Sequence, residues 1–304
     1  MGENPKTVQN PIHLLSVDLE EWFHILEYFS NNSLEHWNSF ESRIHESTEQ
    51  LLVLFENKQV KATFFSLGWI AQKYPDLIER IAKTGHEIGC HSSEHSLVHT
   101  MTPNQFEKDI AKALDRLRSL SGQPVTAFRA PGFSITKKCL WAFVILVRNG
   151  ITVDSSVFPA TRAHGGMPGA PDKPFIIETF SGCIKELPIS TFKWFRKRMA
   201  FSGGGYLRLF PYCIHETLFN HAIRRNKSII LYLHPRDIDK GQPKFKLPPL
   251  RLLKSYINIR TTYKKTERML HRYTFGCIGD VVNYIDWDSA EKLNLDSLKK
   301  RLIG

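Results

Sequence analysis

Short apolar runs alternate with segments of helical periodicity along most of this chain. The apolar runs cover residues 12–17, 60–67, 87–90, 125–128, 151–153 and 228–233, and helical patterns such as 69–83, 102–120 and 137–148 separate them. This alternation is typical of a largely parallel sheet covered by helices. The sequence therefore predicts an α/β fold.

Two of the helical patterns begin at the signature of a capping box, in which a side chain and a backbone N–H bond reciprocally. Thr102 precedes Pro103 and lies three residues before Gln105, so a helix is expected to begin there and to end at Gly122. Residues 47–50 fit the same pattern ahead of a second helix. The stretch 159–212 is rich in glycine and proline and predicts less regular structure.

The length and composition fit one globular domain with a sizeable core. The chain has 304 residues, of which 42% are hydrophobic. We predict a single domain over 1–304, with a core of about 12–240 that holds the motifs and a basic, partly helical extension over about 244–304. The net charge of +11 favours an anionic partner, namely a membrane surface, an acidic glycan or a nucleic acid, or else reflects only a solvated basic surface.

The cysteines and the N-terminus give two further expectations. The five cysteines are widely spaced without a C-x-x-C pair, which favours buried free thiols over disulfides or a cysteine zinc site. Residues 1–10 lack the apolar segment of a signal peptide, and no apolar run is long enough to cross a bilayer. The expected location is cytoplasmic, peripheral to the inner membrane.

Five polar residues follow directly where apolar runs end: Asp18, His91, Arg129, Asp154 and His234. In β/α barrels, the carboxyl ends of the strands meet at one mouth, where active sites lie. We therefore predict that these five side chains converge on one functional site.

A metal site is expected within this group. His91 and His95 form an H-x-x-x-H pair that, on one helical turn, would present both imidazoles to a single divalent ion. The pair lacks the glutamate directly after its first histidine that zincins have. On an extended strand, Asp18 and Glu20 point to the same side while Glu21 points away, so the first two provide one ligand and one general base.

Five motifs occur in order over residues 16–234, and together they resemble the polysaccharide deacetylase family, also called the NodB-homology or carbohydrate esterase family 4 group. They are the acidic motif at 16–20, H-[ST]-x-x-H at 91–95, R-x-P-[YF] with one inserted residue at 129–133, an aspartate motif at 154–156 and Leu-His at 233–234. The resemblance implies a distorted (β/α) barrel of about seven parallel strands. It also implies a metal-dependent hydrolase that removes N-acetyl groups from an amino-sugar polysaccharide or glycan precursor.

The first motif departs from the family's commonest form, because Leu19 replaces the second of two adjacent aspartates. The chain resembles instead a branch with a D-x-E motif, in which Asp18 would be the base and Glu20 a metal ligand beside His91 and His95. The resemblance further implies one divalent ion, zinc by default, with cobalt or nickel as alternatives. His234 would then protonate the leaving amine.

Three supporting roles belong to the same hypothesis. Arg129 would orient Asp18, Asp154 would tune His234, and a backbone N–H near Phe133 would help to hold the oxyanion. A finer resemblance, to deacetylases of exosortase and exopolysaccharide loci, includes residues 17–23, 203–208 and 234–239. The triple glycine at 203–205 is interpreted either as a flexible loop beside the substrate or as a tight turn.

Several alternatives stay open at this point. The D-x-E branch also contains enzymes that act on cyclic imides, so an amidohydrolase or deformylase acting on a small cyclic imide or a lipid-linked sugar is the main one. A non-catalytic glycan-binding protein is a second. Nucleic-acid binding is not expected, because the basic stretches 193–198 and 244–272 match no such motif and contain aromatic residues that suit an anionic membrane better. The sequence does not predict the oligomeric state.

Overall fold

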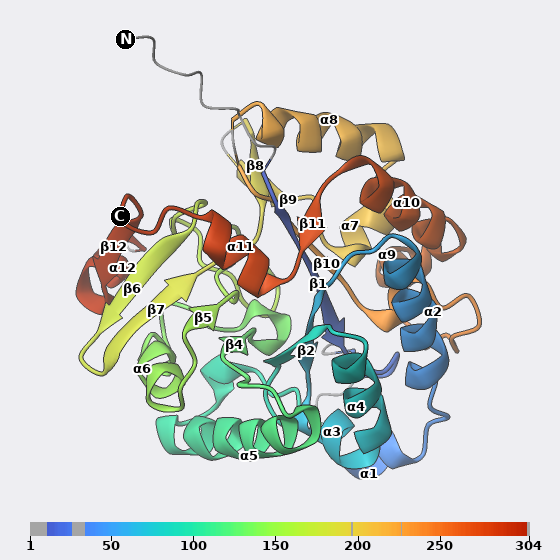
Figure 1. The fold of residues 1–304 in the computed structure, drawn as a ribbon, viewed down its shortest axis with the longest axis horizontal. Coiled ribbons are helices and arrows are strands. Elements are labelled where there is room, and N and C mark those ends of the chain that lie inside the picture. The colour runs from blue at the N-terminus through green and yellow to red at the C-terminus, as the bar shows by residue number, and fades with distance from the viewer. Residues whose placement is uncertain (1–10, 26–33, 196, 226, 303–304) are drawn as a thin grey trace.

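The computed structural model describes residues 11–25, 34–195, 197–225 and 227–302. Within these residues a ten-stranded sheet forms the centre of the molecule, and helices surround it (Figure 1). Its strands are β1 (His13–Leu19), β2 (Thr63–Ser66), β3 (Glu87–Cys90), β4 (Ala127–Phe128), β5 (Val153–Asp154), β6 (Phe175–Thr179), β7 (Gly182–Glu186), β10 (Ile230–Leu233), β11 (Phe275–Gly276) and β12 (Glu291–Asn294).

The strand order is β10-β1-β2-β3-β4-β5-β7-β6-β12, with β11 pairing beside β1. Seven consecutive strands, from β10 to β7, run parallel, and β6 then joins β7 antiparallel. This confirms the predicted fold class. Among the described residues no ladder joins β10 to β12, so the strands form a curved sheet rather than a closed barrel.

Twelve helices, counted over the residues described above, surround the sheet, and most of them bury an apolar face. They are α1 (Leu34–Asn38), α2 (Ile44–Asn57), α3 (Gly68–Lys73), α4 (Pro75–Lys83), α5 (Pro103–Ser121), α6 (Trp141–Arg148), α7 (Gly204–Leu209), α8 (Tyr212–Ile223), α9 (Pro249–Tyr256), α10 (Ile259–Arg272), α11 (Ile278–Tyr284) and α12 (Leu295–Arg301). In α5 the predicted capping box is confirmed: Gln105 N bonds to Thr102 Oγ1 at 3.3 Å, and Thr102 N bonds to the Gln105 side chain at 2.8 Å. Gly122 ends this helix with a left-handed φ of 64°.

Two helix predictions are wrong in detail. The helix expected over 69–83 is divided into α3 and α4, because Pro75 lacks the N–H that would continue the first helix and instead begins the second. The capping box expected at 47–50 lies inside α2, which begins at Ile44. There the Ser47 hydroxyl donates to the carbonyl of Arg43 at 2.7 Å instead of capping the helix.

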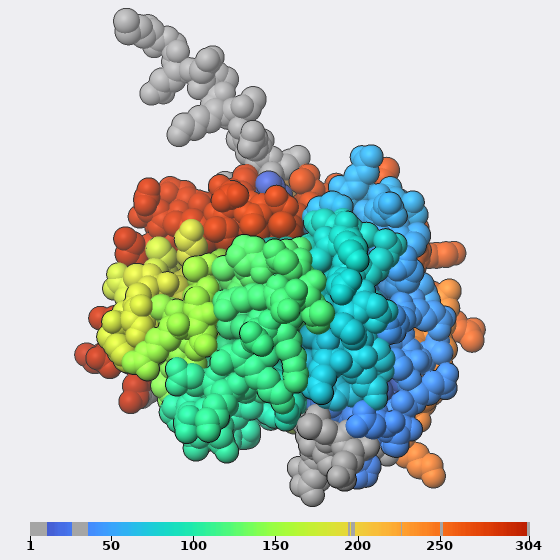
Figure 2. All heavy atoms as spheres, turned by 60° about the horizontal axis from the view of Figure 1, so that its bottom comes forward, coloured from blue at the N-terminus to red at the C-terminus, as the bar shows by residue number. Residues whose placement is uncertain are grey.

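The irregular stretch after residue 159 contains more sheet than its composition predicts. It supplies β6 and β7, and a separate hairpin of β8 (Thr191–Trp194) and β9 (Lys197–Ala200). The C-terminal region adds β11 beside β1 and β12 beside β6. In the space-filling view these late residues, in red, lie along one edge of the body next to the yellow middle segments (Figure 2).

Two other expectations can be compared with the structure. All five cysteines are free, as predicted, but only Cys90 and Cys139 are buried, while Cys183 and Cys213 are exposed. The described part of the chain has no helix with the length and apolar character of a membrane span.

Candidate active site

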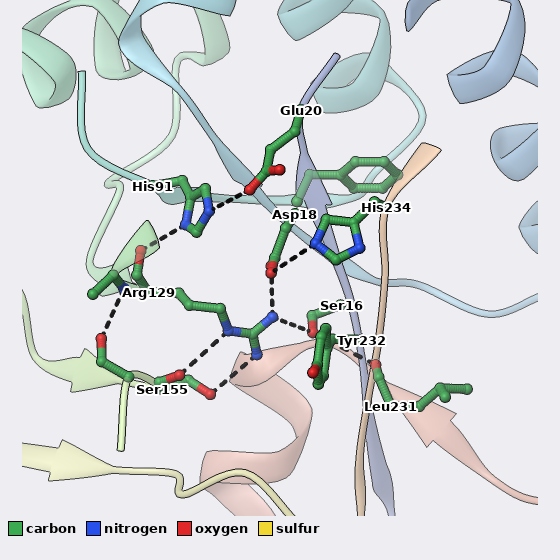
Figure 3. Close-up of polar contacts among 12 residues, drawn as sticks. Ser16, Asp18, Glu20, His91, Arg129, Ser155, Leu231, Tyr232 and His234 are labelled. Carbon is green, nitrogen blue, oxygen red and sulfur yellow. Dashed lines mark hydrogen bonds and ion pairs between the residues drawn. The ribbon is translucent and has the colours of Figure 1, made fainter. Parts of the chain in front are cut away.

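The parallel strands bring Asp18, Glu20, His91, Arg129 and His234 to one edge of the sheet (Figure 3). The register of β1 against β10 pairs Val17 with Leu233, so Asp18, near the end of β1, and His234, directly after β10, lie side by side. Asp18, Glu20, His95 and His234 line one cavity of about 520 Å³. His91, Arg129 and Asp154 are fully buried near it, each directly at the end of its strand.

Glu20, His91 and His95 form a compact cluster whose three ligand atoms lie within 4.8 Å of one another. The Glu20 Oε1 atom lies 2.9 Å from His91 Nε2 and 2.8 Å from His95 Nε2. Burial favours a higher pKa for Glu20, but the charge of His95 and the hydrogen bonds from both histidines hold it well below its usual value. One carboxylate and two imidazoles around a single point are a donor set that suits zinc.

The ring of His91 is oriented from behind by the backbone. His91 Nδ1 lies 2.6 Å from the Arg129 carbonyl oxygen, which can only accept, so Nδ1 is the protonated nitrogen. A protonated His91 donates its Nε2 hydrogen to Glu20, and a neutral His91 would instead turn the Nε2 lone pair toward the point that Glu20 and His95 also face. Metal-binding histidines are fixed in this way by a second hydrogen bond to a carbonyl or carboxylate.

The two histidines lie on an irregular loop, and the helical turn expected for them is wrong. Ser92 and His95 have left-handed φ angles of 70° and 56°, which non-glycine residues adopt only when their surroundings enforce it. The loop is held by the first turn of α3, where Gly68 N and Trp69 N donate to the carbonyls of Ser92 and Ser93. The histidines therefore converge through loop geometry and not through helical spacing.

Arg129 is fully buried and pairs with Asp18. Its NH1 atom lies 2.7 Å from Asp18 Oδ1 and 2.9 Å from Ser16 Oγ, while its NH2 atom donates to Ser155 Oγ at 3.0 Å. This fixes one oxygen of Asp18 and leaves the other, Oδ2, toward His234 at 3.8 Å (Figure 3). The expected contact between Arg129 and Asp18 is thus present.

The carboxylate against His234 is Asp237, a residue that the sequence analysis did not select. Asp237 Oδ2 lies 3.1 Å from His234 Nδ1 and accepts the His234 backbone N–H at 2.8 Å, and Arg208 lies 3.0 Å from its other oxygen. Burial lowers the pKa of His234, but Asp237, Glu20 and Asp18 together raise it to about 9. The residue could have been found in the stretch 234–239, because a carboxylate three residues after a histidine can fold back onto it in a single turn.

The hydrogen-bond partners of Asp154, the residue expected to tune His234, lie elsewhere. Both oxygens of Asp154 accept hydrogen bonds from Ser156, at 2.7 and 3.0 Å, and Asp154 lies beside the buried Glu186. Burial and the Asp154 charge raise the pKa of Glu186 well above its usual value. Asp154 and Glu186 thus form a buried acidic pair in the wall behind Arg129.

The backbone donor expected near Phe133 is already used. The Phe133 N–H donates to the Ala130 carbonyl at 2.9 Å and closes a short turn in which Gly132 and Phe133 both have positive φ angles. Gly132 and Phe133 nevertheless line the cavity. An oxyanion donor at Phe133 N is therefore not supported by this geometry.

The triple glycine packs closely against the site, which neither interpretation of it predicted. A Cβ atom on Gly203 would lie 2.1 Å from the Tyr232 ring, and one on Gly204 would lie 1.7 Å from Asp237 Oδ2. A Cβ on Gly205 would meet nothing closer than Arg208 NH2 at 3.7 Å. The first two glycines allow α7 to begin against the residues that surround His234.

Comparison with known families agrees with this arrangement. The polysaccharide deacetylase family matches residues 36–144, and a domain of unknown function, DUF3473, matches residues 155–283. The chain contains a polysaccharide deacetylase domain. The first family covers His91 and His95, and the second covers His234 and Asp237.

Curated relatives of this domain include two enzymes of the bacterial cell wall. A peptidoglycan-N-acetylglucosamine deacetylase of Bacillus cereus is 33% identical over 114 residues, which cover 36% of this chain and 42% of that protein. A peptidoglycan deacetylase of Helicobacter pylori is 29% identical over 111 residues, 36% of each chain. The similarity thus spans about two fifths or less of these relatives.

Solved structures resemble the deacetylase domain and the remainder of the chain together. A protein of Mycobacterium smegmatis assigned as a polysaccharide deacetylase superposes with a TM-score of 0.60 at 14% identity, covering 91% of this chain and 93% of its own. Puue allantoinase superposes with a TM-score of 0.61 at 12% identity, covering 92% and 91%. At these identities the likeness establishes the fold.

Proposed function

We propose that this protein is a metal-dependent hydrolase that removes N-acetyl groups from an N-acetylated amino-sugar polysaccharide or its precursor. The observation that supports this most is the convergence of Glu20, His91 and His95 on one point, beside Asp18 and His234 in one cavity. The deacetylase domain and the cell-wall deacetylases that it resembles support the same reaction.

The residues fit a divalent ion, and zinc is the ion that we propose. Two imidazoles and one carboxylate leave a fourth position for water or substrate, as in catalytic zinc sites, although the same ligands accept cobalt or nickel. When bound, such an ion polarises the amide carbonyl and lowers the pKa of a water molecule. Glu20, His91 and His95 would hold it.

The remaining residues provide the proton transfers. Asp18, held through Oδ1 by Arg129, accepts the proton of the attacking water through Oδ2. His234, whose Nδ1 is held by Asp237, donates its Nε2 proton to the sugar nitrogen as the C–N bond breaks. Water and the N-acetyl sugar thus become acetate and a free amine. Because His234 protonates the nitrogen, the nitrogen does not have to leave as an anion.

Acetate release from a panel of N-acetylated oligosaccharides tests the proposal. Release should stop with a chelator and return with added zinc. His91→Ala and His95→Ala should lose both bound zinc, measured by elemental analysis, and activity. Glu94 lies between these histidines, half exposed and bonded to Lys112, so Glu94→Gln is the matched control and should keep both.

Full activity in either histidine variant contradicts the scheme. Hydrolysis of small cyclic imides without any acetate release would favour the amidohydrolase alternative.

We also propose that the glycan belongs to exopolysaccharide biosynthesis, and that the protein works in the cytoplasm at the surface of the inner membrane. The charge of +11 supports the contact with an anionic membrane, as do Leu209 and Leu253, which are 39% and 55% exposed, beside Lys254 at the cavity. Co-sedimentation with anionic vesicles but not with neutral ones is expected. Equal recovery with both vesicle types contradicts the membrane contact.

A further inference from the structure

The cavity that contains the proposed catalytic residues has more positive than negative side chains. Two of its three acids pair with arginines, Asp18 with Arg129 and Asp237 with Arg208. The third, Glu20, lies against His91 and His95 and is the carboxylate proposed to hold the ion. Within the described residues, Arg162, Arg236 and Lys254 line the same cavity and form no ion pair with a carboxylate. A divalent ion would add further positive charge.

Arg162 is the most firmly built of these cations. Its guanidinium carbon lies 4.9 Å from the ring centres of both Phe133 and Phe158, and its NH1 atom donates to the Tyr232 hydroxyl at 3.3 Å. One hydrogen bond leaves most of its five N–H donors available. A guanidinium packed between aromatic rings and directed into a cavity is well suited to bind a carboxylate or phosphate.

The loop that carries Arg162 is packed tightly against the cavity wall. A Cβ atom on Gly165 would lie 2.1 Å from the Phe133 carbonyl oxygen, and the Gly166 N–H donates to that oxygen at 3.1 Å. The Met167 N–H also donates to the Phe158 carbonyl at 2.8 Å. These close contacts fix the position of the loop that carries Arg162. Little further conformational entropy is therefore lost when Arg162 binds an anion.

A second cavity of about 400 Å³ continues from this point. Arg162 and His164 line both cavities, and the second is also lined by His99, Lys137 and Lys138. The positive surface therefore extends from the catalytic residues into the adjoining cavity. An extended positive surface of this kind suits a polymeric ligand with repeated negative charges.

We infer that the substrate is an acidic glycan, and that Arg162 binds a carboxylate or phosphate group of a sugar unit next to the one that is deacetylated. The inference rests on the proposed deacetylase function for the reaction, and it adds the class of the substrate. Arg162 acts as a residue that determines specificity and takes no part in proton transfer.

Binding of glycans without an amide tests this inference separately from the reaction. The probes are β-1,4-linked glucose hexasaccharides in three forms: neutral, oxidised to carboxylate at C6 of alternate units, and phosphorylated at C6. Calorimetry with the zinc-loaded protein should give at least one anionic form about tenfold tighter binding than the neutral form, as expected for a charge-assisted hydrogen bond. The anionic form that binds tighter identifies the group.

Three variants separate recognition of charge from packing. Arg162→Gln should remove the anionic preference and leave neutral binding unchanged, while Arg162→Lys should keep part of the preference. Arg148→Gln removes the same charge from an exposed residue of α6, away from the cavity, and should bind as the wild type does. If Arg162→Gln does not fold, Lys137→Gln/Lys138→Gln in the second cavity should weaken the anionic preference instead.

Equal affinity for all three probes, including no measurable binding, overturns the inference, and so does an Arg162→Gln variant that weakens all three alike. An anionic preference that depends on Arg162, with no acetate release from any N-acetylated glycan, would keep the binding site and reject the deacetylase function.

Discussion

Asp237 Oδ2 lies 3.1 Å from His234 Nδ1 and also accepts the backbone N–H of the same histidine at 2.8 Å. Two bonds from one carboxylate fix both the ring and the chain of His234. Arg208 in turn fixes Asp237. The side chain proposed as the general acid is therefore held by a local turn, and not by a residue from a distant strand.

Asp237→Asn is expected to lower acetate release about tenfold or more, within the range of general acid catalysis. Asp237 helps to raise the pKa of His234 to about 9, so its loss lowers that pKa. Because the protonated histidine is the donor, activity falls as pH rises through this pKa. The alkaline limb of the kcat profile should then move to lower pH, and activity measured across pH 6 to 10 tests this.

Asp239→Asn is the matched control for this variant. Asp239 pairs with Arg43 at 2.6 Å and is two residues from Asp237. The Asp239→Asn variant should have the same pH profile of kcat as the wild type. An unchanged alkaline limb in Asp237→Asn would contradict the assignment.

Alanine substitutions along the triple glycine should have unequal effects. Gly204→Ala places a Cβ 1.7 Å from Asp237 Oδ2, so Asp237 must move and activity should fall about tenfold, with a loss of roughly 1–3 kcal/mol from overpacking. Gly205→Ala has room within α7 and should be neutral, or stabilise by about 0.5–1 kcal/mol. Urea unfolding and acetate release measure both effects. Identical behaviour of the two variants would be inconsistent with this packing.

Replacing Glu186 should change how the free energy of unfolding varies with pH above about 4.5. The raised pKa of Glu186 means that the folded protein retains a proton which the unfolded chain has released, so stability falls as pH rises above about 4.5 and toward the folded pKa. Glu186→Gln keeps an acceptor for the Val157 N–H without the charge. The variant should therefore lose less stability than the wild type as pH rises from 5 to 9, because it has no carboxyl group that the folded protein must keep protonated.

Unfolding by urea at pH 5, 7 and 9 measures this difference. Glu178→Gln, an exposed substitution on the same hairpin, should follow the wild type throughout. A large, pH-independent loss of stability in Glu186→Gln would show that the carboxyl group is needed for packing alone.

Buried histidines should make the protein sensitive to mild acid. Burial lowers the pKa of His13, His86 and His215 to about 4. The unfolded chain binds their protons near pH 6.5, so their contribution is present above that pH and is lost as pH falls from about 6.5 to about 4. The free energy of unfolding should fall steeply across this window.

His86→Asn keeps an acceptor for the Ala62 N–H and should make this fall shallower, by up to about 3 kcal/mol at pH 4. The exposed substitution His271→Asn should retain the steep wild-type dependence. Equal slopes in the wild type and in His86→Asn would refute the contribution of His86.

Much of the site follows from sequence, because parallel strands place the residues after their carboxyl ends along one edge. This rule brought Asp18, His91, Arg129 and His234 together without knowledge of the strand order. Alternation along an extended strand also separated Glu20 from Glu21. The Glu21 carboxylate accepts hydrogen bonds from the Ser42 hydroxyl and the Arg43 N–H, away from the cluster of Glu20, His91 and His95.

The features of the site that the sequence did not predict depend on loop and turn geometry, which leaves no periodic pattern in the sequence. The loop of His91 and His95 relies on left-handed residues that no sequence pattern requires. Asp237 reaches His234 through a short turn, and Arg162 reaches the cavity through a loop whose glycines fit the wall of this one fold. The strands β6 and β7 were not predicted because their apolar runs are short and the surrounding glycines and prolines indicated irregular structure.

The position of β1 between β10 and β2 also affects how the site forms during synthesis. The Ser16 hydroxyl bonds to the Leu231 carbonyl, 215 residues further along the chain. A growing chain that has not yet produced β10 already contains Glu20, His91 and His95, but Asp18 then has no histidine facing it. The residues proposed to hold the ion are therefore all synthesised before the residue proposed as the general acid, so an unfinished chain lacks the proton donor that the proposed reaction needs.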